Sequence, residues 1–82
     1  MSDSNSREQL FLNIANAIHV DPENISLGSS NVDFDEWDSM GILEIMTMLD
    51  SKYGLRVEAG DASACNSVKG IIRLLELNGL LS

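Results

Sequence analysis

The sequence is poor in cysteine and in positive charge, and both shortages exclude classes of function. Its single cysteine, Cys65, cannot form an internal disulfide or a thiolate metal cluster, so the fold must hold by packing alone. Thirteen acidic residues against five Lys and Arg give a net charge of −8, which repels phosphate backbones and anionic lipid. Nucleic-acid binding is therefore not expected, and cationic protein surfaces are the favoured partners.

Long apolar runs are also missing. No stretch approaches the roughly 20 apolar residues of a membrane span, and the first residues lack the basic and apolar regions of a secretion signal. We therefore expect no membrane association and a cytoplasmic location, which suits a lone reduced cysteine. With 82 residues, of which 44% are hydrophobic, the chain is expected to form one domain spanning residues 1–82, and a monomer.

What the sequence does contain is apolar residues at helical spacing. A first helix is expected to be capped by Ser4 or Ser6 and to run to about Ile18, with Leu12 outside its buried stripe. The expected stripe consists of Leu10, Phe11, Ile14, Ala17 and Ile18. The only proline lies in residues 21–24, so the helix has ended there and a short helical turn can follow.

Gly, Ser, Asn and Asp dominate residues 26–38, which predicts a long surface loop pinned by a few apolar contacts. The pinning residues are expected to be Leu27, Val32 and Phe34. Further along, residues 62–65 suit one short helical piece, and Ser67 can cap a last helix that ends before Gly79. The expected buried stripe of this last helix is Val68, Ile71, Ile72 and Leu75.

A second long helix is expected to begin at Asp38 or Ser39 and to continue to Tyr53, because Gly54 can supply the left-handed residue that ends helices. If Asp38 is the cap, Trp37 and Ile42 are expected to form a hydrophobic staple. The sector expected to face the core is Ile42, Ile45, Met46, Leu49 and Tyr53. With no strand-period alternation, the predicted fold class is all-α: a small four-helix bundle of three longer helices and one short helix.

The same helix carries a second apolar strip that points away from the core. We name it the docking strip, and its residues are Met40, Leu43 and Thr47. Glu44 flanks it on one side and Asp50 on the other. An exposed apolar strip rimmed by acids is typical of a surface that docks transiently on other proteins, although scattered exposed apolar residues also occur without a function.

Ser39 lies between this strip and the acids of the loop, where it can serve as a helix cap or as a modification site. Catalysis is not expected, because the only histidine, His19, lies at the end of the first helix, and G-x-S-x-G fails with Trp at position 37. A metal site is not expected either. An EF-hand loop counted from Asp33 would place Asp38 where glycine is needed for the sharp turn.

The D-S-M of residues 38–40, which opens a helix reading G-I-L-E-I-M, resembles the D-S-L attachment motif of acyl carrier proteins. The resemblance extends over almost the whole chain, through the Tyr53-Gly54 helix end to the S-V-x-x-I-I start of the last helix. It implies that Ser39 receives 4′-phosphopantetheine from a phosphopantetheinyl transferase, and that the thiol of this group carries acyl or aminoacyl thioesters. The expected partner-recognition residues are Asp38, Met40, Leu43, Glu44 and Thr47, of which Thr47 comes from the helical strip alone.

The chain also departs from the pattern of fatty-acid carriers. Asp35 and Glu36 precede Trp37, where those carriers usually have L-G ahead of the aspartate, and Gly41 replaces a polar residue. The resemblance therefore favours discrete carriers of specialised pathways, such as surface-polysaccharide, polyketide, peptide-synthetase or D-alanyl types. Expected partners are the transferase, acyl- or aminoacyl-activating ligases, and synthase or transferase enzymes. The alternative is an unmodified acidic helical adaptor.

Two further residues receive an interpretation from the sequence. Gly41 costs the second helix up to about 1 kcal/mol relative to alanine, so it is expected to permit close approach of a partner or of the attached arm. Cys65 is interpreted as a buried filler instead of the thiol that carries cargo, because the family has an apolar residue at its position.

Overall fold

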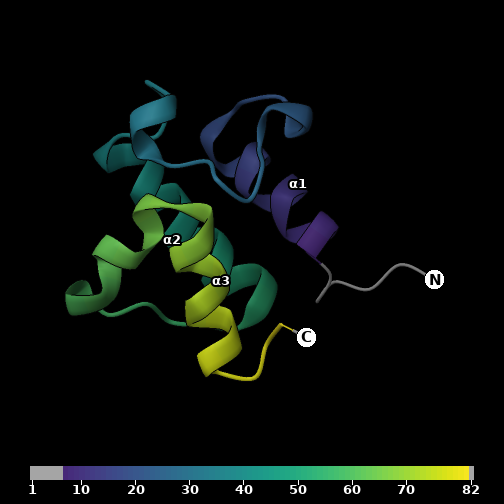
Figure 1. Cartoon of the computed structure of the whole chain (residues 1–82). Coiled ribbons are helices and arrows are strands. Elements are labelled where there is room, and N and C mark those ends of the chain that lie inside the picture. The colour runs from purple at the N-terminus through teal and green to yellow at the C-terminus, as the bar shows by residue number, and fades with distance from the viewer. Residues whose placement is uncertain (1–6, 82) are drawn as a thin grey trace.

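The computed structural model describes residues 7–81, which form helices and no strand (Figure 1). The elements are α1 (Arg7–Ile18), η1 (Pro22–Asn24), η2 (Asn31–Asp33), α2 (Ser39–Tyr53), η3 (Ala59–Asn66) and α3 (Val68–Leu77). The all-α class and the bounds expected for the second and last helices are confirmed. The cap expected at Ser4 or Ser6 lies outside the described residues.

The short third helix differs from its prediction. A helical piece was expected over residues 62–65, but η3 is a 3-10 helix of eight residues, Ala59–Asn66, and a further 3-10 turn, η2, lies in the long loop. The residues of η3 are mostly small, and they form no apolar stripe at the 3.6-residue period of an α-helix. An α-helix would therefore bury no more apolar surface here than the tighter 3-10 helix does. It packs against both α2 and α3.

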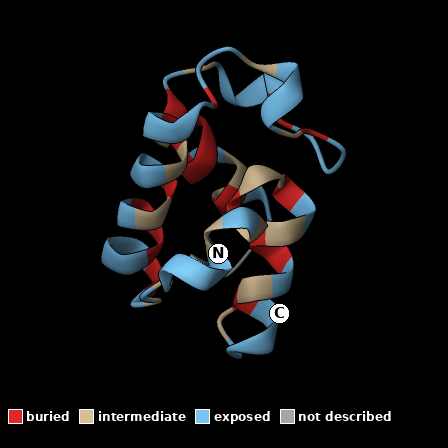
Figure 2. Cartoon of the chain, turned by 90° about the vertical axis from the view of Figure 1, so that its left-hand side faces the viewer, coloured by how far each residue is buried: buried red, intermediate tan, exposed pale blue. Residues whose placement is uncertain are grey.

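The core lies where the three α-helices meet, and in Figure 2 the buried residues of the helices face inward. The stripe predicted on α3 is fully buried, each side chain contributing roughly 1.5 to 3 kcal/mol of hydrophobic stabilisation. On α1, Leu10, Ile14 and Ile18 are buried, whereas Phe11 and Ala17 are partly buried and pack against the core. Leu12 is exposed, as its place off the stripe predicts.

On α2 the buried face is turned slightly from the predicted one. Met48 is buried, whereas Ile42 and Met46 are only partly so. The reason is the packing of α1 against α2, which brings Gly41 into the interface. A Cβ on Gly41 would lie 2.5 Å from the carbonyl oxygen of Glu36 and 3.3 Å from Ile18 Cγ2. Glycine therefore serves a close approach within the chain itself, and the approach of a partner or arm that the sequence led us to expect stays a prediction.

The expectation that Leu27 and Val32 pin the long loop is wrong. Val32 is 85% exposed and Leu27 is also exposed, whereas Phe34 is partly buried with its ring 6.4 Å from that of Trp37. The neighbours of Leu27 and Val32 are Gly28 and polar residues, which offer no apolar contact to hold these two side chains inward. The turn η2 is closed by its own capping box between Ser30 and Asp33.

Hydrogen bonds tie the loop to η3 and to the start of α3 instead. The indole N–H of Trp37, a side chain that is 1% exposed, donates to the carbonyl oxygen of Cys65 at 2.9 Å. The backbone N–H of Val68 donates to the carbonyl oxygen of Ser29 at 3.0 Å. These bonds join positions 28 residues or more apart, so they fix the segment that leads directly into α2. Trp37 thus has a structural role, in the core cluster that Ile42 also contacts.

Candidate functional site

The start of α2 is capped by Asp38. Its backbone is extended, and its carboxylate oxygen Oδ1 accepts a hydrogen bond from the N–H of Gly41 at 3.0 Å. Its carbonyl oxygen accepts the first helical bond, from the N–H of Ile42 at 2.9 Å. An aspartate at this position satisfies one of the free N–H groups and also favours the positive end of the helix dipole. Of the two caps that the sequence allows, the structure has Asp38.

Ser39 is the first helical residue and is exposed. Its Oγ forms no hydrogen bond with any other residue in the range 7–81, because Asp38 already provides the cap. The hydroxyl group is therefore not needed by the backbone beneath it, and an approaching enzyme can reach it. The same freedom means that no side chain of the described residues accepts its proton.

The docking strip is exposed as predicted. Met40 is 65% and Leu43 56% exposed, and Thr47 is exposed with its hydroxyl group donating to the carbonyl oxygen of Leu43 at 3.0 Å. Asp38 and Glu44 are exposed as well. All five expected recognition residues thus lie on the outer side of α2 with Ser39. At 1.5 Å of rise per residue, the set extends about 12 Å along the helix axis from Ser39.

An open groove of about 240 Å³ begins on α2 one turn after Ser39. Its apolar lining is Leu43, Met46 and Val57, and its polar lining is Thr47, Asp50 and Arg56. A groove with apolar and hydrogen-bonding walls suits a ligand with both methyl and amide groups, which is the chemistry of the pantetheine arm that the sequence resemblance implies. We name this surface the arm groove. Sequence reasoning missed Arg56 and Val57, because the irregular segment after Gly54 carries no periodic signal.

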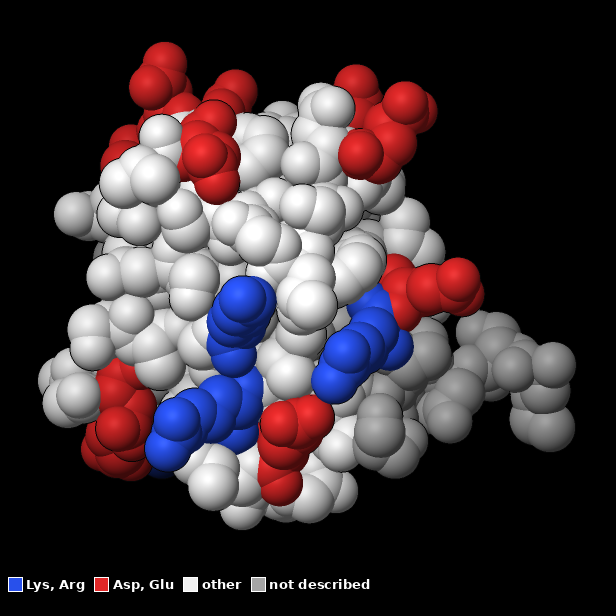
Figure 3. Space-filling model, in the orientation of Figure 1, with Lys and Arg blue, Asp and Glu red and all other residues white. Residues whose placement is uncertain are grey.

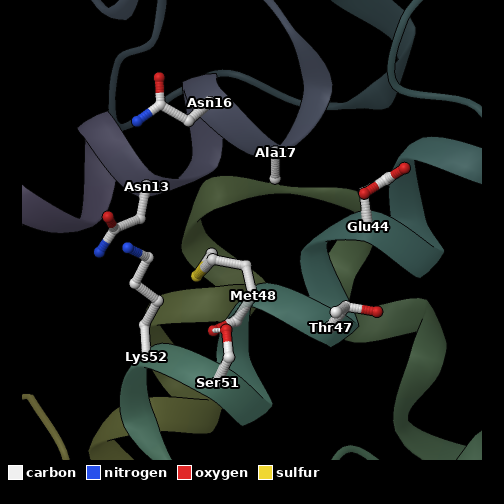
Figure 4. Close-up of a pocket in the computed structure, with 8 residues that line it drawn as sticks. All are labelled: Asn13, Asn16, Ala17, Glu44, Thr47, Met48, Ser51 and Lys52. Atoms are coloured by element: carbon white, nitrogen blue, oxygen red, sulfur yellow. Dashed lines mark hydrogen bonds between the residues drawn. The ribbon is translucent and has the colours of Figure 1, made fainter.

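A second groove runs between α1 and α2 (Figure 4). The side chains of Asn13 and Lys52 lie near one of its ends and that of Glu44 near the other, with Met48 between them. Asn13 is buried on the α1 face, where its amide nitrogen donates to the hydroxyl oxygen of Tyr53 at 3.1 Å. Sequence reasoning missed this pair, although Asn13 lies within the apolar stripe of α1, where a polar residue needs a partner.

Cys65 is fully buried, which confirms its interpretation as a filler. Burial, with a smaller contribution from the charge of Asp61, raises the pKa of its thiol to about 11. The thiol is therefore protonated at neutral pH and is closed off from solvent, two conditions that oppose nucleophilic chemistry. Within residues 7–81, no group of three His, Cys, Asp or Glu side chains is placed to hold a metal ion.

No helix in the described part of the chain is long and apolar enough to cross a membrane. No protein-family model, curated protein or solved structure matches the chain. What the protein does must therefore be inferred from its own residues and their geometry.

Proposed function

We propose that this protein is an acyl or aminoacyl carrier that is modified on Ser39 with 4′-phosphopantetheine and has no enzymatic activity of its own. The observation that carries the proposal is that two different residues serve the start of α2. Asp38 supplies the cap, and Ser39 keeps a free, exposed hydroxyl group. A serine that the fold does not use is available for modification. The attached group would supply a thiol on which acyl or aminoacyl groups are carried as thioesters.

The chemistry of attachment requires a visiting enzyme. Ser39 Oγ would form the new bond to the phosphorus of the phosphopantetheine, while the P–O bond within the diphosphate of coenzyme A breaks and adenosine 3′,5′-bisphosphate leaves. The serine proton must pass to a base of the transferase, because Oγ has no hydrogen-bonding partner in residues 7–81. The docking strip gives that enzyme a place to bind beside the hydroxyl group. Exposed Asp38 and Glu44 add electrostatic attraction, which raises the encounter rate more than the affinity. Fast, weak binding suits a carrier that must leave each partner again.

The arm groove supplies the residues that would hold the attached group. Leu43, Met46 and Val57 can contact its methyl groups, while Thr47 and Arg56 can hydrogen-bond to its amides. Because the groove is open on the surface, a bound thioester would stay accessible to the next enzyme. Together with the specialised-pathway features of the motif, this supports ligases that load the thiol and synthases or transferases that unload it as the partners.

A mass measurement tests the proposal. The wild-type chain is incubated with coenzyme A and a promiscuous phosphopantetheinyl transferase, and its intact mass is recorded. We expect a gain of one phosphopantetheinyl group on wild type and on the Ser67→Ala control, and no gain on Ser39→Ala. Absence of any gain on wild type would contradict the carrier and leave an unmodified acidic adaptor. A gain that persists in Ser39→Ala would show that another residue is modified.

A further inference from the structure

The outer face of α3 carries two basic side chains, in a chain where acidic residues outnumber Lys and Arg by thirteen to five. Lys69 and Arg73 are both exposed and lie one helical turn apart, and Leu77 follows one turn later with 72% of its surface exposed. We name these three residues the basic strip. At 1.5 Å of rise per residue, the strip is about 12 Å long. It belongs to α3, whereas Ser39 and the docking strip belong to α2.

The local energetics of the helix do not explain these two basic residues. Lys69 lies in the first turn of α3, at the positive end of the helix dipole, where a cation is unfavourable and an acidic residue is favoured. Arg73 stands four residues later, and like charges at this spacing destabilise a helix. Local conflicts of this kind are expected at functional sites. The two charges therefore indicate a contact outside the helix.

Neither cation is neutralised within residues 7–81. The only carboxylate on α3, that of Glu76, forms a salt bridge with Arg7 of α1 instead, at 3.6 Å. No ion pair joins Lys69 or Arg73 to any residue that the structure describes. Figure 3, in the orientation of Figure 1, shows Lys and Arg side chains together over α3, while acidic side chains stand at the upper end of the same face. The basic strip thus offers positive charge that the fold leaves unused.

Two cations and a leucine suit a protein surface better than they suit a phosphate polymer or a membrane. Nucleic acid and anionic lipid present negative charge to the whole chain, whose net charge of −8 opposes their approach. A partner protein can place a few carboxylates opposite Lys69 and Arg73 while the rest of its surface is neutral or basic. A second copy of the chain would bring the same net charge of −8, so self-association is disfavoured as well.

We propose that the basic strip binds an acidic segment of a protein partner, with Leu77 as the apolar contact. A partner helix that carries two carboxylates one turn apart has the spacing of Lys69 and Arg73. Each ion pair is exposed and therefore weak, so the complex is transient and sensitive to salt. The proposal goes beyond the carrier function and does not depend on modification of Ser39, because the strip lies on another helix.

The test uses the full chain, labelled with ¹⁵N, and two alanine- and glutamine-rich helical peptides of about twenty residues. The acidic peptide carries Glu, Glu and Leu on successive turns, and the neutral peptide carries Gln in place of both Glu residues. We expect the acidic peptide to shift the amide signals of Lys69, Arg73 and Leu77 in a saturable way, and to bind at least about threefold tighter than the neutral peptide. Equal affinity for both peptides, shifts centred on other helices, or no shifts at all would overturn the proposal.

Matched variants separate the basic strip from net charge. Arg73→Gln removes one positive charge from the strip, and we expect it to weaken binding of the acidic peptide about threefold. Lys52→Gln removes the same charge from the groove between α1 and α2, and it should leave the affinity unchanged. Circular dichroism checks that both variants keep wild-type helicity. Equal weakening by the two variants would show that overall charge, and not the strip, attracts the peptide, and would overturn the inference.

The same labelled chain decides between the proposed partner and two other occupants of the strip. Vesicles of phosphatidylglycerol and phosphatidylcholine test a membrane, and a dilution series of the chain alone tests a second copy. We expect both titrations to leave the signals of Lys69, Arg73 and Leu77 unchanged. Shifts at the basic strip with vesicles, or shifts that grow with the concentration of the chain, would assign the strip to that other occupant and contradict the proposal.

Discussion

The helices α2 and α3 begin with the same local geometry. In α2, Asp38 accepts a hydrogen bond from the N–H of Gly41 at 3.0 Å, and in α3, Ser67 accepts one from the N–H of Gly70 at 3.0 Å. Both glycines sit under a backbone carbonyl group: an added Cβ would lie 2.5 Å from the Glu36 oxygen in α2 and 2.1 Å from the Ala64 oxygen in α3. Both helices thus begin with the same capping hydrogen bond and the same close approach of a glycine to a backbone carbonyl group.

What differs is the use of serine. In α3 the serine is the cap, partly buried, and the residue after it, Val68, is sealed in the core. In α2 an aspartate is the cap, and the residue after it is Ser39, with Met40 exposed beyond it. A serine at a helix start usually has a structural explanation. The molecule contains its own example of that explanation in Ser67, and Ser39 does not share it.

The largest expected changes in stability test the feature that the two helix starts share, the close approach of a glycine to a backbone carbonyl oxygen. Gly70→Ala places a Cβ against a backbone oxygen, so we expect it to lower the free energy of unfolding by about 3 kcal/mol, and Gly41→Ala by about 2 kcal/mol. Urea denaturation measures both. Gly60→Ala is the control, because no atom lies within 4 Å of its added Cβ, and it should change stability by less than about 0.5 kcal/mol. Wild-type stability of Gly41→Ala would mean that the close approach in α2 is not a constraint.

A pH titration tests how tightly the region before α3 is sealed. Burial raises the pKa of Cys65 from 9.0 to about 11, so between these pH values the unfolded chain loses the thiol proton while the folded chain keeps it. Folding stability should therefore be unaffected by this group below pH 9 and fall as pH rises through the window, by about 2 to 3 kcal/mol at most.

The Cys65→Ala variant isolates this effect, and urea denaturation from pH 8 to pH 11 gives the comparison. The variant should lose stability less steeply with pH than wild type does. Burial also raises the pKa of Tyr53, but that contribution is present in both proteins and cancels in the difference. Parallel pH curves would show that the thiol is open to solvent and that the region before α3 is not sealed.

Alanine substitutions at the two helix starts compare the contributions of Ser39 and Ser67 to stability directly. Ser67→Ala and Asp38→Ala each lose a hydrogen bond to a helix N–H, so each should destabilise the fold by about 1 kcal/mol in thermal or urea unfolding. Ser39→Ala loses no such bond and should stay within about 0.5 kcal/mol of wild type. A loss of 1 kcal/mol or more in Ser39→Ala would assign this serine a structural role and remove the contrast.

The smallest effect concerns the exposed faces of the same two helices. Leu43 on α2 is 56% exposed and Leu77 on α3 is 72% exposed, so Leu43→Glu and Leu77→Glu should both keep wild-type helicity in circular dichroism. We expect only Leu43→Glu to slow phosphopantetheinyl transfer, by about threefold, because only α2 presents the docking strip beside Ser39. Equal rates for the two variants would argue against recognition through the strip.

Periodicity predicted most of the fold because it reports burial directly. The four residues of the α3 stripe are all buried, and on α2 the same spacing separated the exposed Leu43 from the buried Ile45. The rotation of the α2 core face toward Met48 could not be predicted, since it depends on how α1 packs and on the carbonyl oxygen that approaches Gly41. That contact joins segments whose relative placement no local pattern encodes.

The candidate site was predictable where it is local and not where it is formed between segments. Ser39, its cap and the docking strip follow from one helix, so helical geometry was enough to place them. Arg56 and Val57 in the arm groove come from another segment, the irregular stretch between α2 and η3. The long loop was misjudged for the same reason, because Trp37 reaches a carbonyl group 28 residues away while Val32 points outward.

The most direct measurement is to locate the modification on the wild-type chain. After incubation with coenzyme A and a phosphopantetheinyl transferase, the protein is digested and its peptides are sequenced by tandem mass spectrometry. We predict a single phosphopantetheinyl group, attached to Ser39 and absent from Ser67. An unmodified Ser39, or the group on any other serine, would contradict the account.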